Sequence, residues 1–134
     1  MKKAPLSFEQ WITKLVENLA SQFDLAGWSI HVEFPTEEKE SAYADNTIDS
    51  TYLYSTLRFY PASRKDFVEG NVNRLVMAAA HELIHLFLDP FQDAIHPFLS
   101  PTTTPAFMEI LEQQTQKLTM VFLKTLPKNL IPLR

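Results

Sequence analysis

The sequence predicts an α+β fold: an N-terminal helix, a small three-stranded sheet, a helix that carries HELIH, and a C-terminal helix that bears glutamates. Three observations indicate this class. Apolar residues recur at helical spacing near both ends of the chain, they alternate with polar residues in shorter runs between, and prolines end these runs. The length of 134 residues suits one hydrophobic core, so we expect residues 1–134 to form a single domain.

The first helix is expected over residues 8–23. Ser7 and Gln10 match a capping box, and apolar residues follow them every three or four positions. From residue 28 the period changes to two, and the alternation continues until Pro35. Residues 28–34 are therefore expected to form a half-buried strand.

Two further strands are expected, over residues 41–45 and, from a clearer alternation, over residues 51–60. A polar stretch over residues 63–70 then leads to a helix that begins after Asn71 and ends at Asp89 and Pro90.

The next segment, DPFQDAIHPFLSPTTTP, contains four prolines and is expected to be a long ordered loop. Thr104 and Pro105 then begin a last helix that runs to about Thr125.

Composition excludes several classes of protein. Without cysteine there are no zinc ribbons, iron–sulfur clusters or disulfides, so a metal site must use His, Asp or Glu. A net charge of −4 gives no basic surface for nucleic acid, which is not expected as a partner. No apolar window is long enough for a signal peptide or a membrane span, so we expect a cytoplasmic protein that has no membrane partner.

The motif HELIH places His81 and His85 one helical turn apart on the same face. Two imidazoles so placed can bind one metal ion. Glu82 lies beside them, where its carboxylate can take a proton from an activated water without being a ligand. Two histidines and a carboxylate would be costly to bury in this apolar helix without a purpose, although satisfied core histidines are the alternative.

A catalytic zinc site needs a third protein ligand, and the last helix offers Glu109 and Glu112. The apolar stripe of that helix passes through Leu111 and Leu118, and Glu112 flanks it, whereas Glu109 points further away. Packing geometry favours Glu112 as the third ligand, with Glu109 as the alternative.

These residues resemble the gluzincin metallopeptidases, and the short chain is similar to the compact ImmA/IrrE-like and phage-encoded minimal forms. In those proteins the third ligand opens a pattern close to ExxAxxFA. The corresponding residues here are Glu112, Thr115, Leu118 and Thr119, with threonine in place of both alanines. The resemblance implies a zincin-like minimal domain that binds Zn²⁺ through His81, His85 and Glu112. It also implies Glu82 as the general base for hydrolysis of a protein or peptide substrate.

Other residues are candidates for supporting roles. His96, in the expected loop, is the first candidate to stabilise the oxyanion, or else it caps a turn. Asp89, or Asp93 equally well, is a candidate to orient a ligand imidazole, while Asp89 is also an ordinary helix end. His31 is expected at the surface. Further oxyanion candidates, or else plain packing residues, are the tyrosines Tyr43, Tyr52, Tyr54 and Tyr60.

In zincins the strand nearest the metal pairs with an extended substrate, and residues 51–60 are expected to supply it here. The leading hypothesis is thus a zinc-dependent peptidase of narrow specificity. The alternative is a catalytically inactive zincin-like binding or regulatory module that acts through protein contacts. Hydrolysis of a non-peptide amide or ester by the same chemistry is a weaker third hypothesis.

Overall fold

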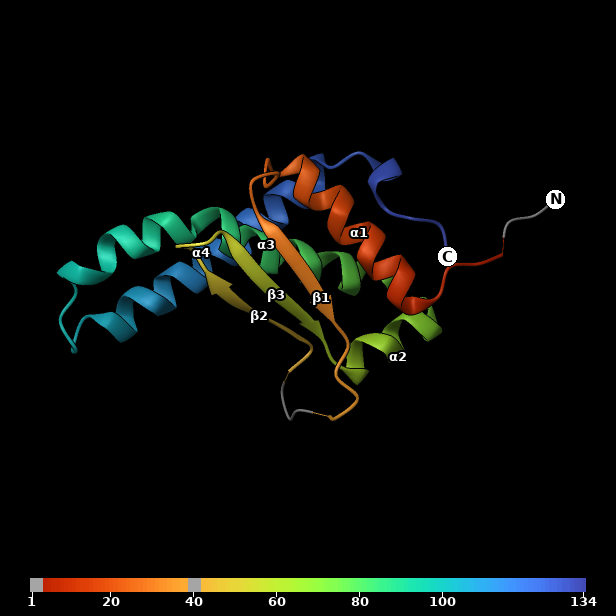
Figure 1. Cartoon of the computed structure of the whole chain (residues 1–134), viewed down its shortest axis with the longest axis horizontal. Helices are drawn as coiled ribbons and strands as arrows, with labels where there is room; N and C mark the ends of the chain where they lie inside the picture. The colour runs from red at the N-terminus through yellow and green to blue at the C-terminus, as the bar shows by residue number, and fades with distance from the viewer. Residues whose placement is uncertain (1–3, 39–41) are drawn as a thin grey trace.

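The computed structural model describes residues 4–38 and 42–134 and confirms the α+β class. A three-stranded mixed sheet lies against helices, and the two longest helices, α3 and α4, run side by side past one end of the sheet (Figure 1). In chain order the elements are α1 (Phe8–Gln22), β1 (Ser29–Glu33), β2 (Ala44–Asp49), β3 (Tyr54–Phe59), α2 (Pro61–Glu69), α3 (Val72–Ile95), η1 (His96–Phe98), α4 (Thr104–Thr125) and η2 (Lys128–Leu130).

Helix α1 begins with the predicted capping box. The Ser7 hydroxyl accepts a hydrogen bond from the Gln10 backbone N–H at 3.1 Å, and the Gln10 side chain accepts one from the Ser7 N–H at 3.0 Å. Two orphan donors of the first turn are thereby satisfied. The apolar stripe of α1 is buried in a core shared with α3 and β3; its fully buried residues are Trp11, Ile12, Leu15 and Leu19.

Strand β3 is the centre of the sheet, whose order is β1-β3-β2. It pairs in parallel with β1 over residues 54–58 and antiparallel with β2 over residues 54–59. A strand paired on both sides has no free edge, so the expectation that residues 51–60 pair with an extended substrate is wrong. The edge strand that packs beside α3 is β2.

Strand β2 occupies residues 44–49 rather than the expected 41–45, and Ser41 lies outside the described residues. Its register with β3 runs from Ala44 opposite Phe59 to Asp49 opposite Tyr54. This strand has no apolar alternation to predict it. Polar contacts across the strands help to stabilise it instead, because Arg58 donates to Asp45 at 3.2 Å and to Thr47 at 2.8 Å.

Helix α2 corrects the expectation of an irregular polar stretch over residues 63–70. Pro61 fits the first turn of the helix, where no backbone N–H is needed, and Gly70 ends the helix with a φ of 84°. Only polar residues, Ser63 and Asp66, are buried on it. The helix therefore lacks the apolar stripe by which sequence periodicity is recognised.

Helix α3 also corrects the sequence interpretation, because it continues through Pro90 to Ile95 instead of ending at Asp89. A proline inside a helix removes one hydrogen bond and crowds the preceding turn, but a long helix with tertiary support can tolerate it. Most of the expected loop is consequently helical, and η1 follows directly. The irregular connection to α4 is only residues 99–103, where hydroxyls of Ser100 and Thr103 satisfy local backbone groups.

None of the helices in the described ranges combines the length and apolar character that a bilayer crossing requires.

The continuity of α3 makes a testable prediction about Pro90, whose side chain is exposed and loses little packing on truncation. Pro90→Ala is expected to raise the free energy of unfolding by about 1–3 kcal/mol, because it restores a hydrogen bond within the helix. Urea denaturation measures this change. Pro97→Ala is the matched control, since it adds similar freedom to the unfolded chain without repairing a helix interior. Equal effects of the two substitutions would mean that α3 ends before Pro90.

Candidate metal centre

The rotation of α3 about its axis aims His81 and His85 away from the hydrophobic core. At about 100° per residue, Ala79, Leu83 and Leu86 share one arc of the helix, and these three residues are fully buried. His81 and His85 lie on the opposite arc, four residues apart, and face α4. Burial of the apolar arc therefore fixes the direction in which both imidazoles point.

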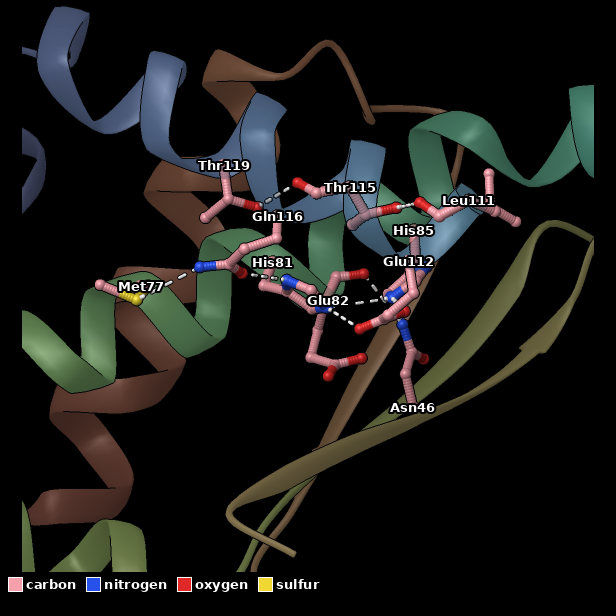
Figure 2. A network of polar contacts seen from close by, with 10 residues as sticks. All are labelled: Asn46, Met77, His81, Glu82, His85, Leu111, Glu112, Thr115, Gln116 and Thr119. Atoms are coloured by element: carbon pink, nitrogen blue, oxygen red, sulfur yellow. Dashed lines mark hydrogen bonds and ion pairs between the residues drawn. The ribbon is translucent and has the colours of Figure 1, made fainter. Parts of the chain in front are cut away.

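Glu112 of α4 meets the two imidazoles (Figure 2). Its carboxylate oxygens lie 2.7 Å from His81 Nε2 and 3.1 Å from His85 Nε2, and the two Nε2 atoms are 3.2 Å apart. The possible ligand atoms of these residues all lie within 4.8 Å of one another. Tetrahedral zinc with bonds of about 2.0–2.1 Å holds neighbouring ligand atoms roughly 3.3 Å apart. Two of the three separations approach that value.

The hydrogen bond to Gln116 determines which nitrogen of His81 is free to bind a metal. His81 Nδ1 lies 2.9 Å from the Gln116 side-chain oxygen, which can only accept, so Nδ1 carries the proton. The Gln116 amide nitrogen faces the Met77 sulfur at 3.8 Å, which agrees with this amide orientation. In the neutral imidazole that carries this proton, the lone pair of Nε2 points at the Glu112 carboxylate and at His85. Such a convergence of electron-pair donors fits a cation.

Burial also suits His85 to this role. Desolvation lowers the pKa of His85, and the Glu112 carboxylate opposes that effect only in part. A neutral imidazole is the form that binds a metal. The side chains of His81 and His85 are 15% and 21% exposed, whereas Glu112 is 59% exposed, so the group is open to solvent on the α4 side.

Thr115 and Thr119 allow α4 to pack closely behind Glu112. Both residues are fully buried, and their hydroxyls donate to the carbonyl oxygens of Leu111 and Thr115 at 2.7 and 2.8 Å. Each hydroxyl is thus satisfied within its own helix. Threonine can replace a small apolar residue here without leaving a buried polar group unpaired.

Glu82 lies next to the histidines but does not belong to the group of residues that could hold a metal ion. Its backbone oxygen accepts a hydrogen bond from the Asn46 side chain of β2 at 3.1 Å, which ties this turn of α3 to the edge of the sheet. Burial, and then the nearby carboxylates of Glu112 and Asp45, raise the pKa of Glu82 to about 8. Its carboxylate consequently holds a proton more readily than an exposed glutamate does.

The structure separates two other candidates from the histidine pair. Glu109 is exposed one turn before Glu112, and within the described ranges no contact joins it to either histidine. His96 follows the last residue of α3, about 16 Å along the helix axis from His85. That distance is too great for its side chain to contact His85, so the structure does not bring His96 to this group.

Asp89 lies one turn beyond His85, yet its polar neighbours are Ser50 and Asp93. Burial and the Asp93 charge raise the pKa of Asp89, and the Ser50 hydroxyl opposes this shift. The same hydroxyl donates to the Asp93 carboxylate. Among residues 4–38 and 42–134 no hydrogen bond joins Asp89 or Asp93 to the imidazole of His81 or His85.

The tyrosines and His31 have ordinary surroundings. Tyr43 donates its hydroxyl to Asp66 at 2.9 Å, and Tyr60 donates to Asp45 at 2.7 Å. Tyr52 and Tyr54 are exposed, and His31 lies on the exposed side of β1, 3.6 Å from Glu33. Of these residues only Tyr43 lies near the histidines, in the wall of a cavity that also contacts His81.

Sequence reasoning missed two residues of this site, Gln116 and Asn46. Gln116 lies one turn after Glu112 on the same face of α4, a spacing that marks a candidate partner once Glu112 is assigned. Asn46 contacts α3 only because β2 lies beside it, and sequence spacing gives no signal for that contact.

Comparison with known proteins finds no matching family model, no similar curated protein and no similar solved structure.

The contacts of Glu112 make a prediction about metal binding. Wild-type protein is expected to hold about one zinc ion per chain. Glu112→Gln should weaken zinc binding by more than the ~10- to 100-fold that follows loss of an outer partner. Zinc affinity by isothermal titration and zinc content by elemental analysis measure this change. Glu109→Gln removes the same charge one turn away and should leave the affinity unchanged; equal losses in both variants would refute the assignment of Glu112.

Gln116 makes a second prediction, because it holds His81 in the tautomer that leaves Nε2 free. Gln116→Ala is expected to weaken zinc binding by about 10- to 100-fold without changing the stoichiometry. Gln113→Ala, an exposed glutamine on the same helix, is the control. An unchanged affinity in Gln116→Ala would show that its hydrogen bond does not orient the ligand.

Proposed function

We propose that this chain is a zinc-dependent peptidase, with His81, His85 and Glu112 as zinc ligands and Glu82 as general base. The observation that carries the proposal is the convergence of His81 Nε2, His85 Nε2 and the Glu112 carboxylate beside a separate carboxylate, Glu82. Two histidines and one glutamate, with no fourth side-chain ligand in the described group, match the donor set of catalytic zinc sites.

Zinc in such a site polarises a carbonyl group and lowers the pKa of water. The protein's own side chains bind the zinc ion and place a proton acceptor, Glu82, beside it. Glu82 lies about 100° around α3 from His81, where its carboxylate faces the site without replacing a ligand. It accepts a proton from the attacking water and passes a proton to the amine that leaves.

The surroundings of Glu82 support this role. Its raised pKa of about 8 brings the carboxylate close to the operating range of a general acid and base at neutral pH. A bound dication opposes the effect of the neighbouring Glu112 and Asp45 charges, which raise this pKa. The Asn46 hydrogen bond to the Glu82 backbone holds the residue in place from the side of the sheet.

The edge strand β2 is the surface against which we propose that an extended substrate binds. Its inner edge pairs with β3, so the outer edge offers backbone groups for strand addition. This strand replaces residues 51–60 in that role. The same residues that position Glu82 therefore lie next to the proposed path of the substrate.

Replacement of Glu82 separates metal binding from catalysis. Glu82→Gln is expected to keep about one zinc per chain and to reduce kcat/KM for peptide cleavage by about 10²- to 10⁴-fold, because the proton acceptor is lost. The measurement uses a peptide library digested by zinc-loaded protein, with cleavage products quantified by mass spectrometry.

Two controls accompany this experiment. Glu109→Gln should cleave as wild type does, and removal of zinc by a chelator should abolish cleavage until zinc is restored. The peptidase proposal would be refuted, and a binding module favoured, by either of two results. One is that zinc-loaded wild type cleaves no peptide; the other is that Glu82→Gln and wild type cleave equally well.

A further inference from the structure

A cavity of about 260 Å³ opens directly beside the proposed catalytic residues. His81 and Glu82 form one part of its wall, and Gln116 of α4 forms another. The opposite wall comes from Tyr43 and Ala44 at the start of the edge strand. A substrate side chain next to the scissile bond would enter this space, because the cavity and the metal ligands share His81.

Arg74 extends this cavity away from the histidines. It lies seven residues, or about two helical turns, before His81, so both residues project from the same face of α3. Their backbone positions are separated by about 10 Å along the helix. An extended peptide advances about 3.3–3.6 Å per residue, so about three residues cover that separation. The long side chains of Arg74 and of a substrate glutamate span part of it, which brings a group one or two residues from the scissile bond within reach of the guanidinium.

The present partners of Arg74 position its guanidinium and leave it accessible. Nη1 lies 3.4 Å from Asp66, and the guanidinium carbon lies 5.4 Å from the Tyr43 ring centroid. Asp66 already accepts hydrogen bonds from Tyr43 and Asn71. The Arg74 side chain is 69% exposed, and a guanidinium carries five N–H donors, so a ligand from solvent can also bind to it.

Arg74 is the feature of this cavity that favours an anionic ligand, whereas the carboxyl group of Glu82 in the same wall does not. No lysine or arginine occurs from residue 75 to residue 116, a segment that contains all the proposed zinc ligands. Among the described residues that line this cavity, Arg74 is the one with a permanent positive charge. Its planar fork of donors matches the two oxygens of a carboxylate.

We propose that this cavity is a substrate subsite that binds a carboxylate, such as a glutamate or aspartate side chain, through Arg74, one or two residues from the scissile bond. The inference rests on the proposed peptidase function and names its substrate class as peptides acidic at that position.

Paired peptide hydroxamates test the subsite without requiring turnover. A hydroxamate group binds zinc, and the two members of each pair differ only by Glu or Gln at the first or second residue from it. Isothermal titration measures their affinity for zinc-loaded wild-type protein. We expect the Glu peptide to bind about tenfold more tightly or better in one of the two positions, as a charge-assisted hydrogen bond predicts.

Variants identify the residue responsible for the preference. Arg74→Gln should bind Glu and Gln peptides equally, Arg74→Lys should retain part of the preference, and Lys117→Gln, an equal loss of charge on α4 outside the cavity, should retain all of it. Zinc content and circular dichroism show whether each variant is folded.

The failures of the two proposals are distinguishable. Equal binding of the Glu and Gln peptides to wild type, or a preference that survives Arg74→Gln, overturns the subsite and leaves the peptidase proposal standing. Binding of neither hydroxamate to zinc-loaded wild type overturns both.

Discussion

Burial of one arc of α3 is the constraint on which the rest of the structure depends. Leu75, Leu83 and Leu86 have no exposed surface and pack in the core that α1 and the sheet share, so the helix cannot rotate without exposing them to water. A helix whose rotation is fixed also fixes the direction of every polar residue on its other arc. His81, His85 and Arg74 therefore receive their positions from apolar contacts on the far side of the helix.

The contact between α3 and α4 brings to His81 two polar side chains that α3 itself does not provide. Thr115 and Thr119 are small enough for close approach and satisfy their own hydroxyls, so α4 packs tightly and places Glu112 and Gln116 opposite His81. The Glu112 carboxylate meets His81 Nε2, and the Gln116 side-chain oxygen accepts a hydrogen bond from His81 Nδ1. The sheet contributes separately, because Asn46 binds the backbone of Glu82 from the third side. The site therefore depends on contacts among α3, α4 and β2: α4 contacts both ring nitrogens of His81, and β2 contacts the backbone oxygen of Glu82 (Figure 2).

The sequence predicted correctly those features that depend on interactions between residues close together in the chain. The capping box at Ser7, the alternation of β1 and the helical spacing within HELIH each depend on residues close in the chain, and the structure reproduces them. The path of α3 through Pro90 and the polar strand β2 depend on contacts with distant segments, which no local pattern reports. The loop expected before His96 was wrong for the same reason, because the helix continues there to Ile95. The remaining contacts of the site, from Gln116 and Asn46, exist only between elements.

The short connection at residues 99–103 has a consequence for how this architecture can vary. It lies at the far end of the α3–α4 pair, about three turns from His85 and about two from Glu112, and the positions of these two residues depend on helix packing nearer the sheet (Figure 1). Residues inserted there would lengthen a surface turn while the two helices kept their register. Natural drift or protein engineering can therefore alter the tip of this hairpin, or attach another domain to it, independently of the His81–His85–Glu112 group.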